Sequence, residues 1–117
     1  MNIKQQTSKM DELVKQGAIL DAVNQFFSDD ATTTDYGNGI TQGKSEMLAK
    51  MEGFLGAIAN VNGIKHHHTI VENNVSASEF TFDFDMKDGS KIYWHEIIRR
   101  IWNEEGKVIQ EQYFNAQ

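Results

Sequence analysis

Cysteine is absent from the 117 residues, and its absence rules out several kinds of chemistry. A chain without thiols forms no disulfides, offers no thiolate ligands to a metal and has no cysteine nucleophile. Long hydrophobic runs are missing too, since the segment from Met1 to Gly17 is polar and mixed in charge, unlike a secretion signal or a membrane span. We therefore expect a cytoplasmic protein with no membrane partner.

Basic residues are few and scattered. Lysine and arginine number 11 against 17 aspartates and glutamates, and the longest Lys/Arg run is Arg99-Arg100. The formal charge of -6 repels phosphate backbones, so a nucleic-acid partner is not expected. Repeats and low-complexity tracts are also lacking, and 39% hydrophobic residues suit an ordered core. The length fits one domain over residues 1–117.

Three amphipathic segments in the first half of the chain predict helices. The first begins at a capping-box pattern, Ser8 followed by Asp11, and ends at Gly17. The second runs from Ala18 to a turn at 28–30, and the third follows Gly43 and ends at 60–63. Their apolar faces carry Met10, Leu13 and Val14; Ile19, Ala22, Val23, Phe26 and Phe27; and Met47, Leu48, Met51, Phe54, Leu55 and Ile58.

The second half of the chain predicts a sheet. After Gly63 the apolar period becomes two, which indicates strands over residues 64–72, 75–86, 91–102 and 107–114. Turn residues at 88–89 and 104–106 join the last three strands into an antiparallel meander, and a short threonine-rich edge strand over 31–36 precedes them. Helices followed by hairpins predict an α+β fold, with three helices packed on a curved antiparallel sheet.

The predicted strand over 91–102 is apolar on both faces, because Ile92, Trp94, Ile98 and Trp102 alternate with Tyr93, Ile97 and Ile101. Three short helices can cover only one face of the sheet. We therefore predict a homodimer in which a second copy covers the outer face.

Several short motifs resemble the nuclear transport factor 2-like superfamily. They are the run Phe26-Phe27-Ser28-Asp29-Asp30-Ala31-Thr32-Thr33-Thr34-Asp35-Tyr36, the helix opened by Gly43, and Gly106-Lys107-Val108-Ile109 before Tyr113-Phe114. The SnoaL-like polyketide cyclase and ketosteroid isomerase branches are the most similar, over nearly the whole order of elements. The resemblance implies a cystatin-like α+β roll whose sheet and helices enclose a cone-shaped pocket, while the activities of its members vary widely.

The resemblance gives Asp35 a catalytic role. In ketosteroid isomerases the same Asp-Asp-Ala-Thr run leads to an aspartate that removes a proton beside a carbonyl, which requires a partly apolar pocket. Alternatively, Asp35 ends a strand and accepts turn hydrogen bonds. The oxyanion tyrosine of these isomerases has no counterpart before Tyr36, and their neutral second aspartate falls on Ile98, so steroid isomerisation by that mechanism is not expected.

Three consecutive histidines lie in the first predicted strand of the sheet. The alternation of a strand places His66 and His68 on one face and His67 on the other. Histidines occur on pocket strands of SnoaL-like proteins and of the related scytalone dehydratases, which implies a pocket role for His66 or His68, with His68 as the assisting catalytic group. The alternative is a polar strand face with solvated imidazoles. No third ligand stands at a set spacing, so no metal site is expected.

The predicted register also gives the ligand-binding residues. Trp94, Glu96 and Ile98 would face the pocket beside Glu111, Tyr113 and Asn115, with Tyr36, Met51, Phe54 and His66 completing its wall. Glu96 is a second acid or base, the cross-strand partner of Arg99 or Arg100, or a solvent-exposed side chain. A register slip of one residue would put His95, Gln110, Gln112 and Phe114 there instead. Phe80, Phe82 and Phe84 are predicted to be core, with Asp83 and Asp85 on the outer face.

These patterns favour a pocket protein for a small hydrophobic molecule. It would be an isomerase, cyclase or dehydratase that needs no cofactor and transfers a proton through a carboxylate, in the isomerase or lyase class. The alternatives are a ligand-binding module without catalysis and a dimeric accessory domain with a filled cavity. The sequence has no phosphate loop, metal cluster or nucleophile triad that would support another reaction class.

Overall fold

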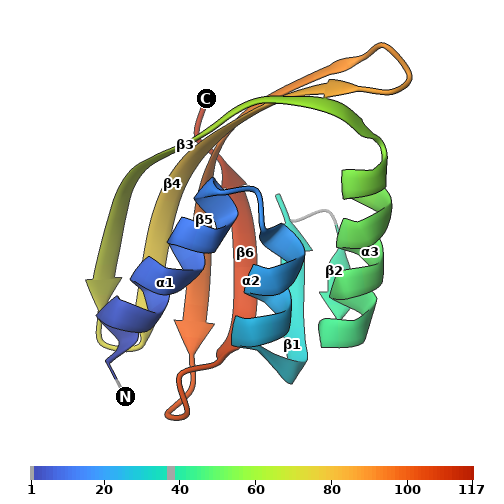
Figure 1. The fold of residues 1–117 in the computed structure, drawn as a ribbon. Helices are drawn as coiled ribbons and strands as arrows, with labels where there is room; N and C mark the ends of the chain where they lie inside the picture. The colour runs from blue at the N-terminus through green and yellow to red at the C-terminus, as the bar shows by residue number, and fades with distance from the viewer. Residues whose placement is uncertain (1, 37–38) are drawn as a thin grey trace.

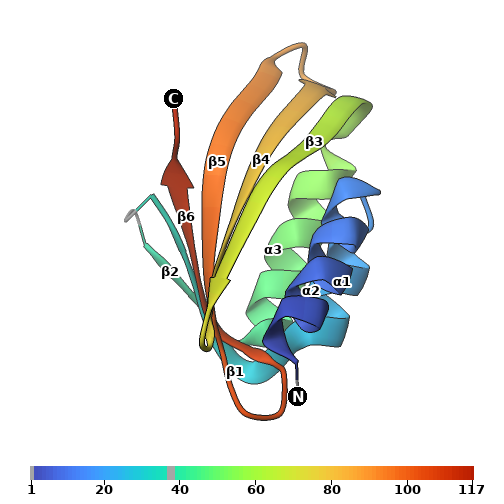
Figure 2. The same ribbon diagram turned by 90° about the vertical axis from the view of Figure 1, so that its left-hand side faces the viewer.

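The computed structural model describes residues 2–36 and 39–117 and has an α+β architecture. Three helices, α1 (Ile3–Lys15), α2 (Ile19–Phe26) and α3 (Lys44–Gly56), lie on one face of a single sheet. Figure 1 shows the long strands of this sheet bending over the helices, and Figure 2 shows the opposite face of the sheet without helices. The fold class predicted from the sequence is confirmed.

The first helix starts earlier than the capping-box pattern predicts. Its N-cap is Asn2, whose side chain accepts a hydrogen bond of 3.1 Å from the backbone N–H of Gln5. Asp11 lies inside the helix and is 1% exposed, so it is no capping residue. Gly17 ends the helix as predicted, with a φ of +83° that suits glycine.

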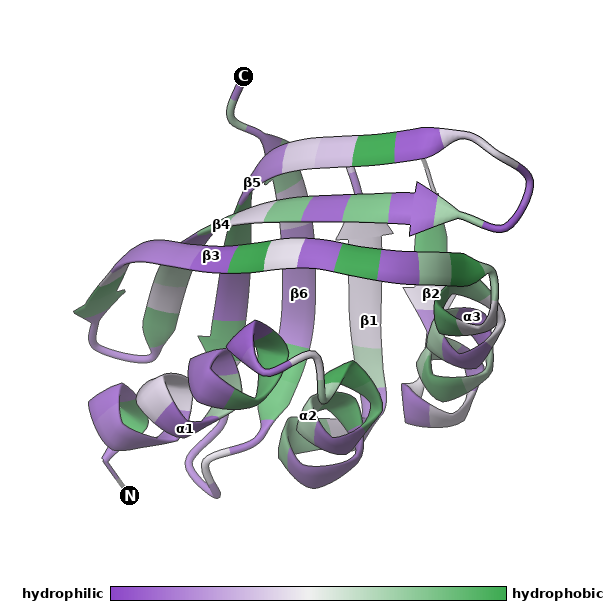
Figure 3. Ribbon diagram, turned by 45° about the horizontal axis from the view of Figure 1, so that its top comes forward, coloured by the Kyte–Doolittle hydropathy of each residue, from purple (hydrophilic) through white to green (hydrophobic). Residues whose placement is uncertain are grey.

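The sheet has six strands in the order β2-β1-β6-β5-β4-β3. They are β1 (Phe27–Asp35), β2 (Ile40–Gln42), β3 (Ile58–Glu72), β4 (Val75–Met86), β5 (Lys91–Trp102) and β6 (Val108–Asn115). From β3 to β6 each strand pairs antiparallel with the next, which confirms the predicted meander. In Figure 3 the bands of β4 alternate between hydrophobic and hydrophilic, as expected for a strand whose two faces differ.

The strand β1 departs from the prediction in three ways. It begins at Phe27 instead of Ala31, it lies between β2 and β6 instead of at an edge, and it runs parallel to β6. The predicted turn at 28–30 is part of this strand. Its pairing explains the error, because Phe27 pairs with Val108 and Thr32 with Gln110, which leaves the intervening residues as a bulge that resembles a turn in sequence.

The boundary between α3 and β3 was predicted too late. The helix ends at Gly56, and Ile58, expected on the helix face, pairs with Met86 of β4. Asn62 also belongs to β3, where its side chain donates a 3.1 Å hydrogen bond to Asp83. Pairing with β4 therefore overrides the local turn propensity of the asparagines.

One hydrophobic core joins the helices to the inner face of the sheet. It contains Phe80, Phe82 and Phe84 of β4, as predicted, and Phe26 meets the core tryptophan Trp102 edge to face at 6.0 Å. Toward the end of the sheet next to α3 this core gives way to a cavity. Among the described residues, no helix is both long and apolar enough to cross a membrane.

Candidate functional site

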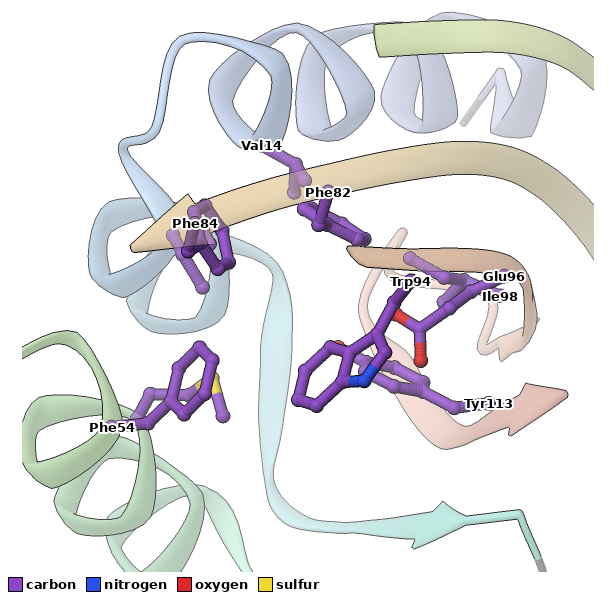
Figure 4. A pocket seen from close by; sticks show the side chains of 10 residues that line it. Val14, Phe54, Phe82, Phe84, Trp94, Glu96, Ile98 and Tyr113 are labelled. Atoms are coloured by element: carbon purple, nitrogen blue, oxygen red, sulfur yellow. The ribbon is translucent and has the colours of Figure 1, made fainter. Parts of the chain in front are cut away.

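A small cavity opens between the helices and the inner face of the sheet. Its volume is about 50 Å³, and eight of its ten lining residues are apolar. They are Val14, Ile19, Met51, Phe54, Phe82, Phe84, Trp94 and Ile98, and the other two are Glu96 and Tyr113. Figure 4 shows these side chains converging from α1, α3 and the strands, with the Glu96 carboxylate pointing into the space they enclose.

Glu96 is the carboxylate of this cavity. It lies in the middle of β5 and is 2% exposed, and its Oε2 accepts a hydrogen bond from the phenol of Tyr36. Burial raises the pKa of the Glu96 carboxyl to about 7, the hydrogen bond from Tyr36 partly offsets this rise, and the charges of Asp35 and Glu111 add to it. Glu96 can therefore gain or lose a proton near neutral pH. It pairs with neither arginine considered in the sequence analysis.

Tyr36 reaches Glu96 from an unusual backbone conformation. Its φ is +50°, in the left-handed region that residues other than glycine rarely adopt. Its backbone N–H donates a 2.9 Å hydrogen bond to the carbonyl of Tyr113, so both its backbone and its side chain are held by the site. Burial, followed by the bond to Glu96, raises the pKa of the Tyr36 phenol, so it remains a hydrogen-bond donor.

A buried ion cluster of Arg100, Asp11 and Glu111 lies next to the cavity. Arg100, 1% exposed, donates a 2.8 Å hydrogen bond to Asp11 of α1 and a 3.1 Å bond to Glu111 of β6. Ser78 and Thr69 each donate a 2.8 Å bond to the second oxygen of Asp11. Burial raises the pKa of Glu111 in spite of Arg100 beside it. Tyr113 also lies beside Glu111 and lines the cavity, so the cluster borders the pocket.

Asp35, predicted as the catalytic base, lies outside the lining of the cavity. It ends β1 opposite Tyr113, and its carboxylate is paired with Lys50 of α3. Its side chain is 35% exposed, and Lys50 also donates a 3.4 Å bond to Thr41. Asp35 is nevertheless close enough for its charge to raise the pKa of Glu96. It therefore stands at the rim of the site with its charge already paired.

The three histidines do not alternate as a regular strand requires, because a bulge at His67 separates the pairs His66↔Phe80 and His68↔Glu79. His66 stays on the inner face, where it stacks on Phe80 and binds Thr69 at 2.5 Å. His68 is exposed and lies opposite Glu79 on the outer face. The expectation that His66 and His68 share a face is therefore incorrect, and His68 does not reach the cavity.

A second, polar cavity surrounds His66. It has a volume of about 290 Å³ and is lined by α1 and β3 residues that include Asp11 and Thr69. His66 Nε2 is 3.6 Å from Asp11 Oδ2. His66 therefore belongs to the far side of the ion cluster and does not line the Glu96 cavity.

The other predicted ligand contacts are divided between the cavity and its surroundings. Met51, Phe54, Trp94, Glu96, Ile98 and Tyr113 line it, and Tyr36 reaches it through Glu96. Glu111 lies behind the wall, and Asn115 is beyond it, opposite Glu96 in the register. Sequence reasoning missed the contributions of Val14, Ile19, Phe82 and Phe84. It also missed Arg100, although Arg100 shares the alternation of Glu96 and Ile98 and could have been found by it.

Comparison with known proteins gives a fold but no sequence family. No family model matches the chain, and no curated protein matches its sequence. A SnoaL-like polyketide cyclase candidate from Mesorhizobium loti superposes with a TM-score of 0.87 at 23% identity, covering 97% of this chain and 99% of that one. The chain has the nuclear transport factor 2-like fold. The resemblance predicted from the motifs is confirmed at the level of the fold.

Other proteins with the nuclear transport factor 2-like fold are known with small molecules. One from Catenulispora acidiphila, in complex with trimethylamine, has a TM-score of 0.73 at 12% identity and matches 89% of this chain and 80% of its own. TerC, co-crystallised with polyporic acid, has a TM-score of 0.76 at 8% identity, with coverages of 97% and 91%. At these identities the likeness concerns the fold alone.

Proposed function

We propose that this protein binds a small, mainly apolar molecule in the cavity lined by Glu96. The observation that carries the proposal is the composition of the wall, in which apolar side chains surround one buried carboxylate and one phenol. Such a wall desolvates a ligand while a few polar groups fix its orientation. The ligands of TerC and of the Catenulispora protein support small-molecule binding as a use of this fold.

The size of the cavity limits the ligand. A volume of about 50 Å³ is well below the roughly 300–1,000 Å³ of pockets for drug-sized molecules. Phe54 and Trp94, which both line the cavity, stack with their ring centroids 5.6 Å apart, and Trp94 is 37% exposed. A larger ligand would have to separate this aromatic pair, whereas one of a few heavy atoms fits without rearrangement.

Filling the cavity should weaken binding. We expect acetone, a neutral ketone of four heavy atoms, to bind the wild type in a ligand-observed NMR titration. Met51→Trp should weaken binding by about tenfold or more, because the larger side chain occupies the cavity from a partly exposed helix position. Glu52→Trp, an exposed neighbour on the same helix, is the matched control. Equal affinity for the ketone in all three proteins would refute binding in this cavity.

The second candidate function is proton transfer, in the isomerase or lyase class. It is favoured by the pKa of Glu96, which burial raises to about 7, close to the optimum for a general acid or base at neutral pH. Glu96 then takes the part that the sequence analysis gave to Asp35, whose charge is paired with Lys50. Against this candidate, Asp35 and His68 do not converge with Glu96 on one ligand position.

The acetone titration also separates the two functions when it is run in deuterium oxide. Proton transfer predicts that the wild type speeds deuterium uptake at the carbons beside the carbonyl and that Glu96→Gln abolishes this gain. Binding without catalysis predicts an unchanged uptake rate at full occupancy.

We also propose a homodimer through the face of the sheet that carries no helices. This face exposes Tyr93 and Phe114, and Phe114 pairs with Ile97 in the register of β5 and β6. Aromatic and aliphatic side chains on a helix-free sheet face are typical of a surface covered by a partner.

Sedimentation tests the dimer. At micromolar concentration the wild type should sediment as a dimer and Phe114→Asp as a monomer, because the added charge would be buried without a partner. Ile40→Asp, an exposed position on the edge strand β2, should leave the dimer intact. A monomeric wild type would refute the proposal.

A further inference from the structure

Around the cavity, within the described part of the chain, carboxylates outnumber lysine and arginine side chains. Four carboxylates, those of Asp11, Asp35, Glu96 and Glu111, lie in or beside it, but only two lysine or arginine side chains pair with them. Arg100 is bound by Asp11 and Glu111, and Lys50 is bound by Asp35. Within residues 2–36 and 39–117, no salt bridge reaches Glu96.

This arrangement leaves Glu96 buried without a counter-ion. An ionised carboxylate that is removed from water needs a cation or several hydrogen bonds to offset its lost hydration. Glu96 has one hydrogen bond, from Tyr36, and the helices contribute only apolar side chains to the lining around it. A positively charged group placed in the cavity would supply the missing interaction.

The walls are suited to an organic cation. Phe54, Phe82, Phe84 and Trp94 all line the cavity, and their rings form a contiguous aromatic surface, in which Phe54 meets Phe84 at 6.0 Å and Trp94 at 5.6 Å. The faces of aromatic rings attract alkylated ammonium groups, and they do so most strongly where water is excluded. Figure 4 shows Phe54 and Phe84 across the space from Trp94, whose indole ring lies beside the Glu96 carboxylate.

We propose that the ligand of this cavity is a small alkylated ammonium ion, whose charge pairs with Glu96 and whose methyl groups contact the aromatic rings. The inference rests on the proposed binding function and specifies the class of its ligand. The volume of about 50 Å³ agrees with it, because it suits an ion of only a few heavy atoms. A trimethylammonium ion has four heavy atoms.

The two other classes of ligand fit the charges less well. An anion would be repelled by the Glu96 carboxylate, which lines the cavity. A neutral molecule would fill the apolar part but leave the Glu96 carboxylate without a partner. Protons should compete with the cation, because the cation pairs only with the ionised form of Glu96. The titratable groups facing Glu96 are Tyr36, Asp35, Glu111 and Tyr113.

Matched ligands test the proposal. Binding of trimethylammonium chloride and of tert-butyl alcohol, its uncharged analogue, is measured by NMR titration at constant ionic strength on the wild type, Glu96→Gln and Glu79→Gln. Glu79 is a carboxylate on the outer face, paired with His95, and serves as the control. Glu96→Gln should weaken trimethylammonium binding by about tenfold or more and leave tert-butyl alcohol within about threefold. Lowering the pH from 8 to 5 should weaken trimethylammonium binding by up to about a hundredfold, because Glu96 becomes protonated.

Each outcome has a separate meaning. If tert-butyl alcohol binds and trimethylammonium does not, the cation proposal is overturned while the apolar binding pocket stands. If neither binds, the binding function fails as well. If the cation binds equally to the wild type and Glu96→Gln, or loses as much affinity in Glu79→Gln, its site is not the Glu96 carboxylate.

Discussion

Replacing Arg100 with methionine should lower the free energy of unfolding by about 3–5 kcal/mol, the range found when one partner of a buried ion pair is removed. The substitution keeps most of the side-chain volume but leaves Asp11 and Glu111 buried without a cation. Urea unfolding followed by circular dichroism at pH 7.5 measures the change. The loss should be smaller at pH 5, because burial raises the pKa of Glu111 and a proton can then neutralise its unpaired charge.

The neighbouring residue provides the control for this experiment. Arg99 lies on the other face of β5, is partly exposed and donates a 2.8 Å hydrogen bond to Gln112. Arg99→Met should cost about 1 kcal/mol or less, because its charge remains in contact with water. Adding Asp11→Asn and Glu111→Gln to Arg100→Met should restore part of the lost stability. Equal losses for Arg99→Met and Arg100→Met would mean that the buried ion cluster contributes no more to the free energy of unfolding than the partly exposed contact of Arg99.

The second large effect concerns pH and Glu96. Its pKa in the folded protein is about 7, above the ordinary value of 4.5, so the folded state holds a proton that the unfolded chain releases at lower pH. The stability that this group contributes is complete below pH 4.5 and is lost as the pH rises through 7. The shift corresponds to about 2–3 kcal/mol when some screening by solvent is allowed for.

Glu96→Gln removes this titration and keeps a hydrogen-bond acceptor for Tyr36. We expect the variant to gain about 2–3 kcal/mol relative to the wild type between pH 5 and pH 8 in urea unfolding. Glu104→Gln, at the exposed turn before β6, is the control for removing a carboxylate. Parallel stability curves for the wild type and Glu96→Gln would show that the Glu96 carboxylate is not desolvated in the folded state.

The sequence predicted the parts of the fold that depend on local pattern. The alternation of apolar residues gave the strands β4 and β5 with their observed limits, and Gly17 correctly ended α1. The same alternation placed Trp94, Glu96 and Ile98 on the face that lines the cavity. These features follow from side-chain periodicity and turn chemistry, which a single segment carries by itself.

The features that were missed depend on distant partners. Asp11 resembled a helix-capping residue because it follows Ser8 by three positions. Its actual partner, Arg100, lies 89 residues away in the sequence. The bulge that turns His68 outward exists only in the pairing of β3 with β4. Asp35 was assigned by resemblance, but Lys50 of α3 occupies its carboxylate. No local pattern could have shown these contacts.

The parallel pairing of β1 with β6 has a consequence for how the protein is made. The strand at residues 27–35 emerges from the ribosome early, but its neighbour at 108–115 is translated after all the other strands. Until then Arg100 lacks Glu111, and the nascent chain exposes one side of β1 and of β5. Contacts between residues so far apart also slow folding. Productive folding therefore has to wait for the last strand, and a ribosome stalled before it would hold an unfinished sheet with open edges.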